Sequence, residues 1–130
     1  MQKSLVDTDI LSEYLRGKNE KVLRNAEAYL RAHRRFSISV LTLFEVVRGR
    51  HQARQFERVT QFLDWTKGAE LVPFDSECAR LGGEIAGTLL RSGTTVGVAD
   101  VLIAATAIVH KLTLVTGNVD HYQRMRSFGR

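Results

Sequence analysis

The sequence predicts an α/β domain with a mostly parallel central sheet flanked by helices. Short apolar or β-branched runs alternate along the chain with longer segments in which apolar residues recur at helical spacing. Strands that alternate with helices in this way pair in parallel, because each helix carries the chain back across the sheet. At 130 residues, with 44% hydrophobic and 25% charged residues, the chain has the size and composition of one globular domain, which we expect to cover residues 1–130.

The first half of the chain opens with a short apolar strand, expected at residues 3–6. Apolar residues then recur at helical spacing from near Thr8, and Gly17 can end this first helix. A second helix with one apolar side is expected over residues 20–33. It is followed by a β-rich segment that predicts a strand over residues 36–40.

The next predicted helix begins at a Thr-x-x-Glu sequence formed by Thr42 and Glu45, a pattern in which the threonine caps the helix. We expect this helix to reach residue 49 and to resume through residues 56–63. The remaining predicted elements are a strand at 70–73, helices at 76–91 and 98–110, and a strand at 112–116.

The charge of the chain is positive, with 19 Lys and Arg against 14 Asp and Glu. Arginine guanidinium groups suit phosphate oxygens, so nucleic acid is a reasonable partner, although solvated helix faces would explain the same charges. The basic side chains form three clusters, which are Arg31, His33, Arg34 and Arg35, then Arg48, Arg50, His51, Arg54 and Arg58, and finally Arg124, Arg126 and Arg130.

The sequence contains no apolar stretch long enough to span a bilayer and no secretory start, so we expect a cytoplasmic protein without a membrane partner. Its single cysteine, Cys78, excludes an internal disulfide and a cysteine-rich zinc site, and we expect a small buried helix residue. The four histidines share no metal-ligand spacing and are expected at the surface or at helix ends.

Three acidic residues lie inside apolar segments. Asp7 ends the first predicted strand, Glu45 has apolar neighbours on both sides, and Asp100 lies within the long apolar run at 96–109. A carboxylate in such surroundings costs on the order of several kcal/mol of desolvation unless a cation meets it. No Lys or Arg stands beside Asp100 in the sequence. A divalent metal ion shared by the three acids is the simplest cation that meets this need.

The predicted topology can bring these acids together, because ligands of parallel sheets gather outside the carboxyl ends of the strands. Asp7 and Glu45 follow the first and second predicted strands, and Asp100 opens the last long helix. Four further residues are expected to support the site, namely Asp9, Thr116, Asn118 and Asp120.

Oxygen ligands of this kind favour Mg²⁺ or Mn²⁺, which keep open positions for a phosphate oxygen and a water molecule. Hydrolysis of a phosphodiester by metal-assisted attack of water is the chemistry that such a site predicts. Simpler explanations remain open for some of these residues: Asp7 as a helix cap, Glu45 as part of a capping box, Thr116 as a plain strand residue and Asp120 as a polar turn residue. Asp100, in its apolar surroundings, is the hardest to explain in this way.

Four motifs of the chain together resemble the PIN domain, and most closely the VapC-type toxins of toxin–antitoxin pairs. The motifs are Leu5-Val-Asp-Thr-Asp-Ile-Leu11, Ile38-Ser-Val-Leu-Thr-Leu-Phe-Glu45, Gly97-Val-Ala-Asp-Val-Leu-Ile-Ala-Ala105 and Leu114-Val-Thr-Gly-Asn118. They stand in the family's order and cover nearly the whole chain. The resemblance implies a magnesium- or manganese-dependent endoribonuclease that acts on RNA. It also implies a homodimer, held inactive by an antitoxin through which alone it would meet DNA. The family's metal-site roles match Asp7, Glu45 and Asp100.

The chain departs from the family pattern at three places. Asp9 stands where the family often has Asn, which adds a negative charge near the metal. Asn118 stands where the fourth acid often lies, which leaves Asp120 as a nearby candidate ligand. Many relatives continue past the position of Arg130 into a short final strand, so we expect this edge of the sheet to be missing or trimmed.

Two other functions compete with the ribonuclease. The Asp7-Thr-Asp9 sequence after a strand resembles the motif of haloacid-dehalogenase-like phosphatases, but a later lysine and paired acids are not convincingly placed. The alternative of another class is a nuclease-dead PIN module whose basic groups hold nucleic acid or a protein partner.

Overall fold

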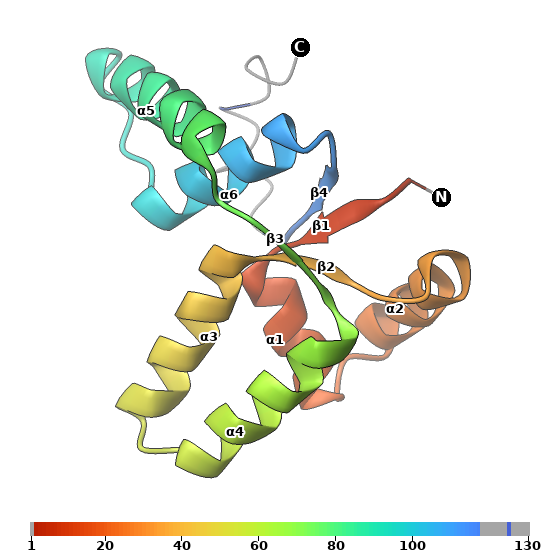
Figure 1. Cartoon of the computed structure of the whole chain (residues 1–130). Coiled ribbons are helices and arrows are strands. Elements are labelled where there is room, and N and C mark those ends of the chain that lie inside the picture. Colours follow the sequence, from red (N-terminus) through yellow and green to blue (C-terminus); the bar gives the residue numbers. More distant parts are fainter. Residues whose placement is uncertain (1, 118–124, 126–130) are drawn as a thin grey trace.

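The computed structural model of the chain, which describes residues 2–117 and 125, has a parallel four-stranded sheet at its centre (Figure 1). The strands are β1 (Ser4–Val6), β2 (Ser37–Ser39), β3 (Glu70–Val72) and β4 (Thr113–Val115), and their spatial order is β3-β2-β1-β4. Leu5 pairs with Ser37 on one side and with Leu114 on the other, so β1 is a central strand. The predicted α/β class and mostly parallel sheet are confirmed.

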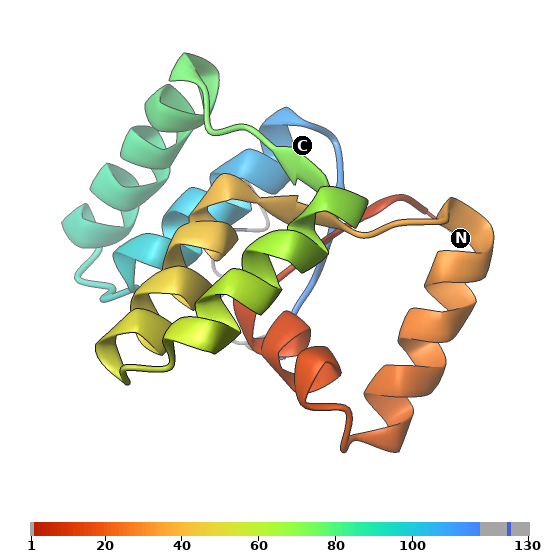
Figure 2. The same ribbon diagram turned by 60° about the horizontal axis from the view of Figure 1, so that its bottom comes forward.

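The helices cover both faces of the sheet. They are α1 (Thr8–Arg16), α2 (Glu20–His33), α3 (Val40–Gln52), α4 (Phe56–Trp65), α5 (Ser76–Arg91) and α6 (Val98–Val109), with a short 3₁₀ turn at Thr66–Gly68. Helices α5 and α6 pack together on one side, and α1 to α4 lie on the other (Figures 1 and 2). The chain is therefore a three-layer α/β/α domain.

Alternation along β1 supplies one residue to each half of the core. Val6 packs with Leu11, Ile38 and Phe62 in the layer of α1 to α4, whereas Leu5 packs with Ile103 on the α6 side. Both strand residues are buried because β1 is covered on both faces, which explains why two apolar residues follow each other directly in this strand.

The predicted elements agree with the observed ones within a few residues, with one error at the start of α3. Thr42 was expected to cap this helix, but Ser39 is the N-cap, and its hydroxyl accepts a hydrogen bond from the Leu41 amide at 3.0 Å. Helix α3 therefore begins at Val40, directly after β2, and Thr42 lies fully buried in its first turn. Glu45 consequently sits beyond the capping position, which removes the capping-box explanation for it.

Cys78 is fully buried on α5, as expected. Among the residues that the structure describes, no helix is both long and apolar enough to cross a membrane.

Candidate metal centre

The carboxyl ends of three neighbouring strands bring the predicted site residues to one edge of the sheet. Asp7 follows β1, Thr116 follows β4, and α3 with Glu45 begins directly after β2. The Asp7 amide donates to the carbonyl of Val115 at 2.9 Å, which extends the β1–β4 pairing to the point where Asp7 and Thr116 face each other.

Asp7 is the most buried acid of this group, with 3% of its surface exposed. Its Oδ1 accepts from the Thr8 amide and its Oδ2 accepts from the Thr116 hydroxyl, both at 2.7 Å. Burial raises the pKa of Asp7, the Thr116 and Thr8 hydrogen bonds lower it, and the charges of Asp9 and Asp100 raise it again. Asp7 is thus both the N-cap of α1 and a desolvated carboxylate in the field of two other acids.

Glu45 is connected to this group through Thr8, a residue that the sequence alone did not single out. The Thr8 hydroxyl donates to Glu45 Oε1 at 2.7 Å and lies 3.1 Å from the Thr42 hydroxyl oxygen. Thr8 therefore joins the first turn of α1 to the first two turns of α3. Its place between two acids in the Asp7-Thr-Asp9 sequence was the available signal, but the partner on α3 depends on tertiary structure.

Asp100 lies half-buried in the first turn of α6. Its charge raises the pKa of Asp7, so the two carboxylates belong to one electrostatic group. The amide groups at the start of α6 carry partial positive charge, which favours an acid in this turn. Asp9 is exposed on the first turn of α1 and contributes negative charge to the same group.

No basic side chain of the described residues balances the negative charge of Asp7 or Glu45, the two members of the site whose hydrogen bonds are best defined. Within the part of the chain that the structure describes, Asp7 and Glu45 accept hydrogen bonds from hydroxyl and amide groups and form no ion pair. Hydroxyl donors satisfy lone pairs but do not cancel charge. The oxygen atoms of Asp7, Glu45 and Asp100 do not form a set within 4.8 Å of one another, as those of a closed metal site would. Carboxylates that gather at one edge of a sheet with uncancelled charge nevertheless suit a hard divalent cation such as Mg²⁺ or Mn²⁺, which can be held partly through water.

Two predicted supporting residues, Asn118 and Asp120, lie outside the described residues. Thr116 lies beside Asp7, and its hydroxyl donates to Oδ2 of that carboxylate.

A second group of possible metal ligands lies elsewhere, where Asp75, Cys78 and His110 bring their ligand atoms within 4.8 Å of one another. His110 ends α6 and Asp100 begins it, and ten residues of helix correspond to about 15 Å, so the two groups are distinct. Local hydrogen bonds already explain this second group. Asp75 caps α5 through the Cys78 amide, and His110 Nε2 is 3.0 Å from the Pro73 carbonyl oxygen. Its thiol and imidazole also suit softer metals than magnesium.

Comparison with models of known protein families shows the family of this chain. The model of the PIN domain matches residues 4–126. The chain belongs to the PIN domain family. The converging acids therefore lie at the carboxyl edge of the sheet of a PIN domain.

This PIN domain is similar in sequence to proteins named as VapC ribonucleases. It is 31% identical to Ribonuclease VapC1 of Methanocaldococcus jannaschii over 98% of this chain and 84% of the relative. It is 29% identical to the tRNA(fMet)-specific endonuclease VapC of Salmonella typhimurium over 96% of this chain and 93% of the relative. The domain is thus of the VapC type.

Solved structures give the same result. The DNA-bound VapBC2 complex of Rickettsia felis contains a chain that is 27% identical, with a TM-score of 0.80 over 93% of this PIN domain and 91% of that chain. The DNA-bound VapBC complex of Salmonella typhimurium gives 28% identity and a TM-score of 0.80 over 95% and 92% of the two chains. The predicted resemblance to VapC-type PIN domains is confirmed.

Proposed function

We propose that this protein is the toxin of a toxin–antitoxin pair and cuts RNA as a divalent-metal-dependent endoribonuclease. The observation that carries the proposal is that Asp7, Glu45 and Asp100 gather at one edge of the sheet, where Asp7 and Glu45 form no ion pair among the described residues. The ribonuclease names of the VapC relatives agree with this chemistry.

Asp7 and Asp100 would hold the metal, with Glu45 completing the carboxylate set and Asp9, Asn118 and Asp120 supporting it. A Mg²⁺ or Mn²⁺ ion bound there would neutralise charge that develops on the phosphate and lower the pKa of a water molecule. Thr116 and Thr8 fix Asp7 Oδ2 and Glu45 Oε1 by hydrogen bonds, so these carboxylates are oriented before a substrate arrives. The scissile phosphate would meet the site from the exposed side, near Asp9.

The two alternative functions have less support, and each can be distinguished from the ribonuclease. Membership of the PIN family removes the main support for a haloacid-dehalogenase-like phosphatase, which rested on Asp7-Thr-Asp9 alone. A nuclease-dead binding module would keep RNA affinity without cleavage.

RNA cleavage under metal control tests the proposal. Purified protein should cut single-stranded RNA, lose the activity in EDTA and regain it with manganese or magnesium. Asp100→Asn should abolish cleavage while retaining the folded state, and Asp75→Asn, a carboxylate of the second group, should cut normally. RNA that stays intact in every metal would contradict the ribonuclease and favour the binding module.

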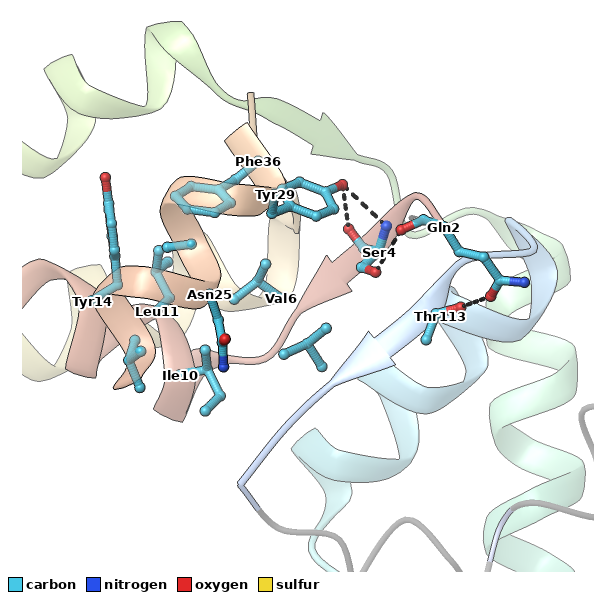
Figure 3. A pocket seen from close by; sticks show the side chains of 13 residues that line it. Gln2, Ser4, Val6, Ile10, Leu11, Tyr14, Asn25, Tyr29, Phe36 and Thr113 are labelled. Carbon is cyan, nitrogen blue, oxygen red and sulfur yellow. Dashed lines mark hydrogen bonds between the residues drawn. The ribbon is translucent and has the colours of Figure 1, made fainter. Parts of the chain in front are cut away.

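An antitoxin is the partner that the VapBC complexes support, and this chain offers hollows where one could dock. An apolar hollow of about 460 Å³ lies between α1, α2 and the β1–β4 edge, with Leu11, Tyr14 and Phe36 in its wall (Figure 3). A second hollow beside it is lined by Tyr14, Leu23 and Leu30. Tyr14, Leu15 and Leu30, which we propose as docking positions, are half-buried and pack against the core, so their side chains serve the fold as well.

In this proposal the antitoxin presents a Lys or Arg side chain to the acids, since a cation there satisfies the buried carboxylates in place of a metal. The protein would reach DNA only through the antitoxin. A homodimer is the assembly that VapC-type membership implies, and sedimentation of the purified protein would test it.

A further inference from the structure

A hollow of about 560 Å³ lies between α1, α3 and α4, away from the acids, and its walls carry four basic side chains. Arg16 and Lys18 come from the end of α1 and the residues after it, Arg50 from α3 and Arg58 from α4. Phe62 and Trp65 of α4 form apolar wall beside them. No carboxylate is among the residues that line this hollow in the described part of the chain. We refer to it as the cationic pocket.

Arg50 is held in place by the protein itself. Its Nη1 donates to the main-chain carbonyl of Arg58 at 3.0 Å, and its guanidinium carbon lies 5.4 Å from the centre of the Phe62 ring. These contacts use part of the guanidinium fork and leave other N–H donors for a ligand. Because the Arg50 side chain is already ordered, the binding of an anion carries a smaller entropic cost.

Only one of the four cations of the pocket has an acidic partner among the described residues. Arg16 forms an ion pair with Glu13 at 2.8 Å, but Lys18, Arg50 and Arg58 form none among the described residues. Burial and the nearby charge of Arg58 lower the pKa of Arg50. Like charges that a fold holds together without a local partner are stabilised when an anion binds between them.

The pocket lies at a defined separation from the candidate metal centre. Helix α1 carries Thr8 at its start and Arg16 at its end, a rise of about 12 Å, and α3 carries Glu45 and Arg50, a rise of about 8 Å. Stacked nucleotides advance roughly 3.4 Å each along a strand, so the pocket lies about two to four nucleotides from the acids.

We propose that the cationic pocket binds the phosphate backbone of a single-stranded RNA whose scissile bond lies at the candidate metal centre. This inference rests on the proposed ribonuclease function and names the part of the surface that holds the substrate. An acidic cluster repels a polyanion, so a nuclease built on carboxylates needs cations nearby to keep its substrate in place. Single-strand binding combines basic side chains with a ring on which a base can stack, and the half-buried Trp65 offers such a ring, whereas Phe62 is buried beneath Arg50.

RNA accounts for the pocket better than an acidic segment of a protein does. Arginine forks fit phosphate and carboxylate oxygens alike, so the choice of RNA rests on the half-buried ring of Trp65 beside the cations, on which a base can stack. Helices α1 and α3 each carry residues of both sites, so the pocket and the acids lie on the same side of the sheet.

Salt-dependent RNA binding tests the proposal. Asp7→Asn protein, which should bind without cutting, would be titrated with a labelled single-stranded RNA of about ten nucleotides at several salt concentrations. Adding Arg50→Gln and Arg58→Gln should weaken binding roughly tenfold at low salt. It should also reduce the slope of log affinity against log salt by about 0.7 for each phosphate that the protein no longer neutralises.

The matched control is the pair Arg24→Gln and Arg31→Gln, which removes the same charge from exposed positions of α2 that already pair with Glu20 and Glu27. Urea unfolding of both pairs checks that the variants are folded under the conditions of the binding assay, because Arg50→Gln also loses the contacts with the Arg58 carbonyl and the Phe62 ring. Equal loss of affinity in both pairs would assign the effect to net charge and overturn the pocket.

Two other results would also overturn it. If wild-type protein cuts RNA and the pocket variants keep the parent's affinity and slope, the pocket is wrong while the ribonuclease stands. If the pocket variants bind RNA normally but lose a co-expressed antitoxin, the pocket is a protein contact. Failure of the wild type to bind or cut any RNA would instead reject the proposed function, and the pocket with it.

Discussion

A threonine hydroxyl holds two helices of the candidate site in register. Thr8 donates to Glu45 Oε1 and also touches Thr42, so it fixes an acid on α3 from the first turn of α1. Removing a residue that orients a metal ligand in this way commonly changes metal affinity by roughly 10- to 100-fold. Thr8 therefore acts on the proposed metal through Glu45.

Thr8→Val should lower manganese affinity about tenfold, because Glu45 loses its hydrogen-bond donor while the side chain keeps its shape. Thr8→Ser should restore the affinity. Isothermal titration with manganese measures both, and an unfolding curve for each variant checks the fold. Equal affinity in all three proteins would mean that Glu45 needs no positioning by Thr8.

Asp7 makes stability depend on pH in a direction that its environment sets. Burial raises its pKa above the unfolded value of about 3.9, with Asp9 and Asp100 adding to the shift and the Thr116 and Thr8 hydrogen bonds opposing it. The folded protein thus keeps this proton to a higher pH than the unfolded chain does. In the metal-free protein, the Asp7 contribution to the free energy of unfolding should fall as pH rises from about 4 through the raised pKa.

Asp7→Asn should remove this decrease, so the metal-free variant should become more stable than the wild type as pH rises from about 4 towards 7. Urea unfolding in EDTA at several pH values measures the difference. Saturating manganese should reverse the order, because only the wild-type carboxylate binds the ion. A difference that does not vary with pH in EDTA would show that Asp7 titrates alike in both states.

At the scale of single elements, local patterns predicted most helices and strands but misplaced the start of α3. Both Ser39 and Thr42 are good caps, and only Thr42 has a Glu three residues later. The choice of Ser39 depends on β2, which ends at Ser39 because its pairing with β3 ends at Val72. Pairing between segments far apart in the sequence is a tertiary contact, so no local pattern could reveal it.

Two glycines in helical regions should respond to alanine with opposite signs. Gly17 ends α1 with φ at +70°, a conformation that strains an L-residue, so Gly17→Ala should destabilise the protein by about 1 kcal/mol. Gly83 lies exposed inside α5 with open space around its Cα, so Gly83→Ala should stabilise it by about 0.5 to 1 kcal/mol. Urea unfolding of the two variants measures the change in the free energy of unfolding for each. Changes of the same sign would contradict either the end of α1 at Gly17 or the place of Gly83 inside α5.

At the scale of the whole molecule, the sequence indicated which segments would meet but not how. Parallel strands placed Asp7, Glu45 and Thr116 at one edge because each follows or opens an element there. The hydroxyl link through Thr8 and the cationic pocket depend on how α1 packs against α3 and α4. Helix packing is decided by side chains from distant segments, so it escaped the sequence pattern.

Divalent metal should stabilise the whole domain, because the acids converge only in the folded chain. At a concentration about a hundred times the dissociation constant, binding adds about 2.7 kcal/mol, enough to raise the melting temperature by roughly 10 °C. Asp100→Asn should reduce this rise, and Cys78→Ser, in the second ligand group, should leave it unchanged. Thermal melts in EDTA, magnesium and manganese measure it, and an equal rise in all three proteins would place the ion elsewhere.

The proposed antitoxin should depend on the hollows between α1 and α2. Leu30 is half-buried in the wall of one of them, and a charge there would oppose an apolar partner helix. Expressed alone, the wild type should arrest growth, and co-expression of the short gene encoded next to it should relieve the arrest. Leu30→Glu should keep the toxicity but escape this relief, because the acids remain intact while the docking surface does not.

Leu90→Glu, at an exposed leucine on α5, is the matched control and should still be neutralised. Co-purification of each variant with the tagged partner measures docking directly. If the tagged partner still captures the Leu30 variant fully, the docking surface does not include this part of α2. If cells that express soluble wild-type protein grow without arrest, the proposed toxin function is rejected.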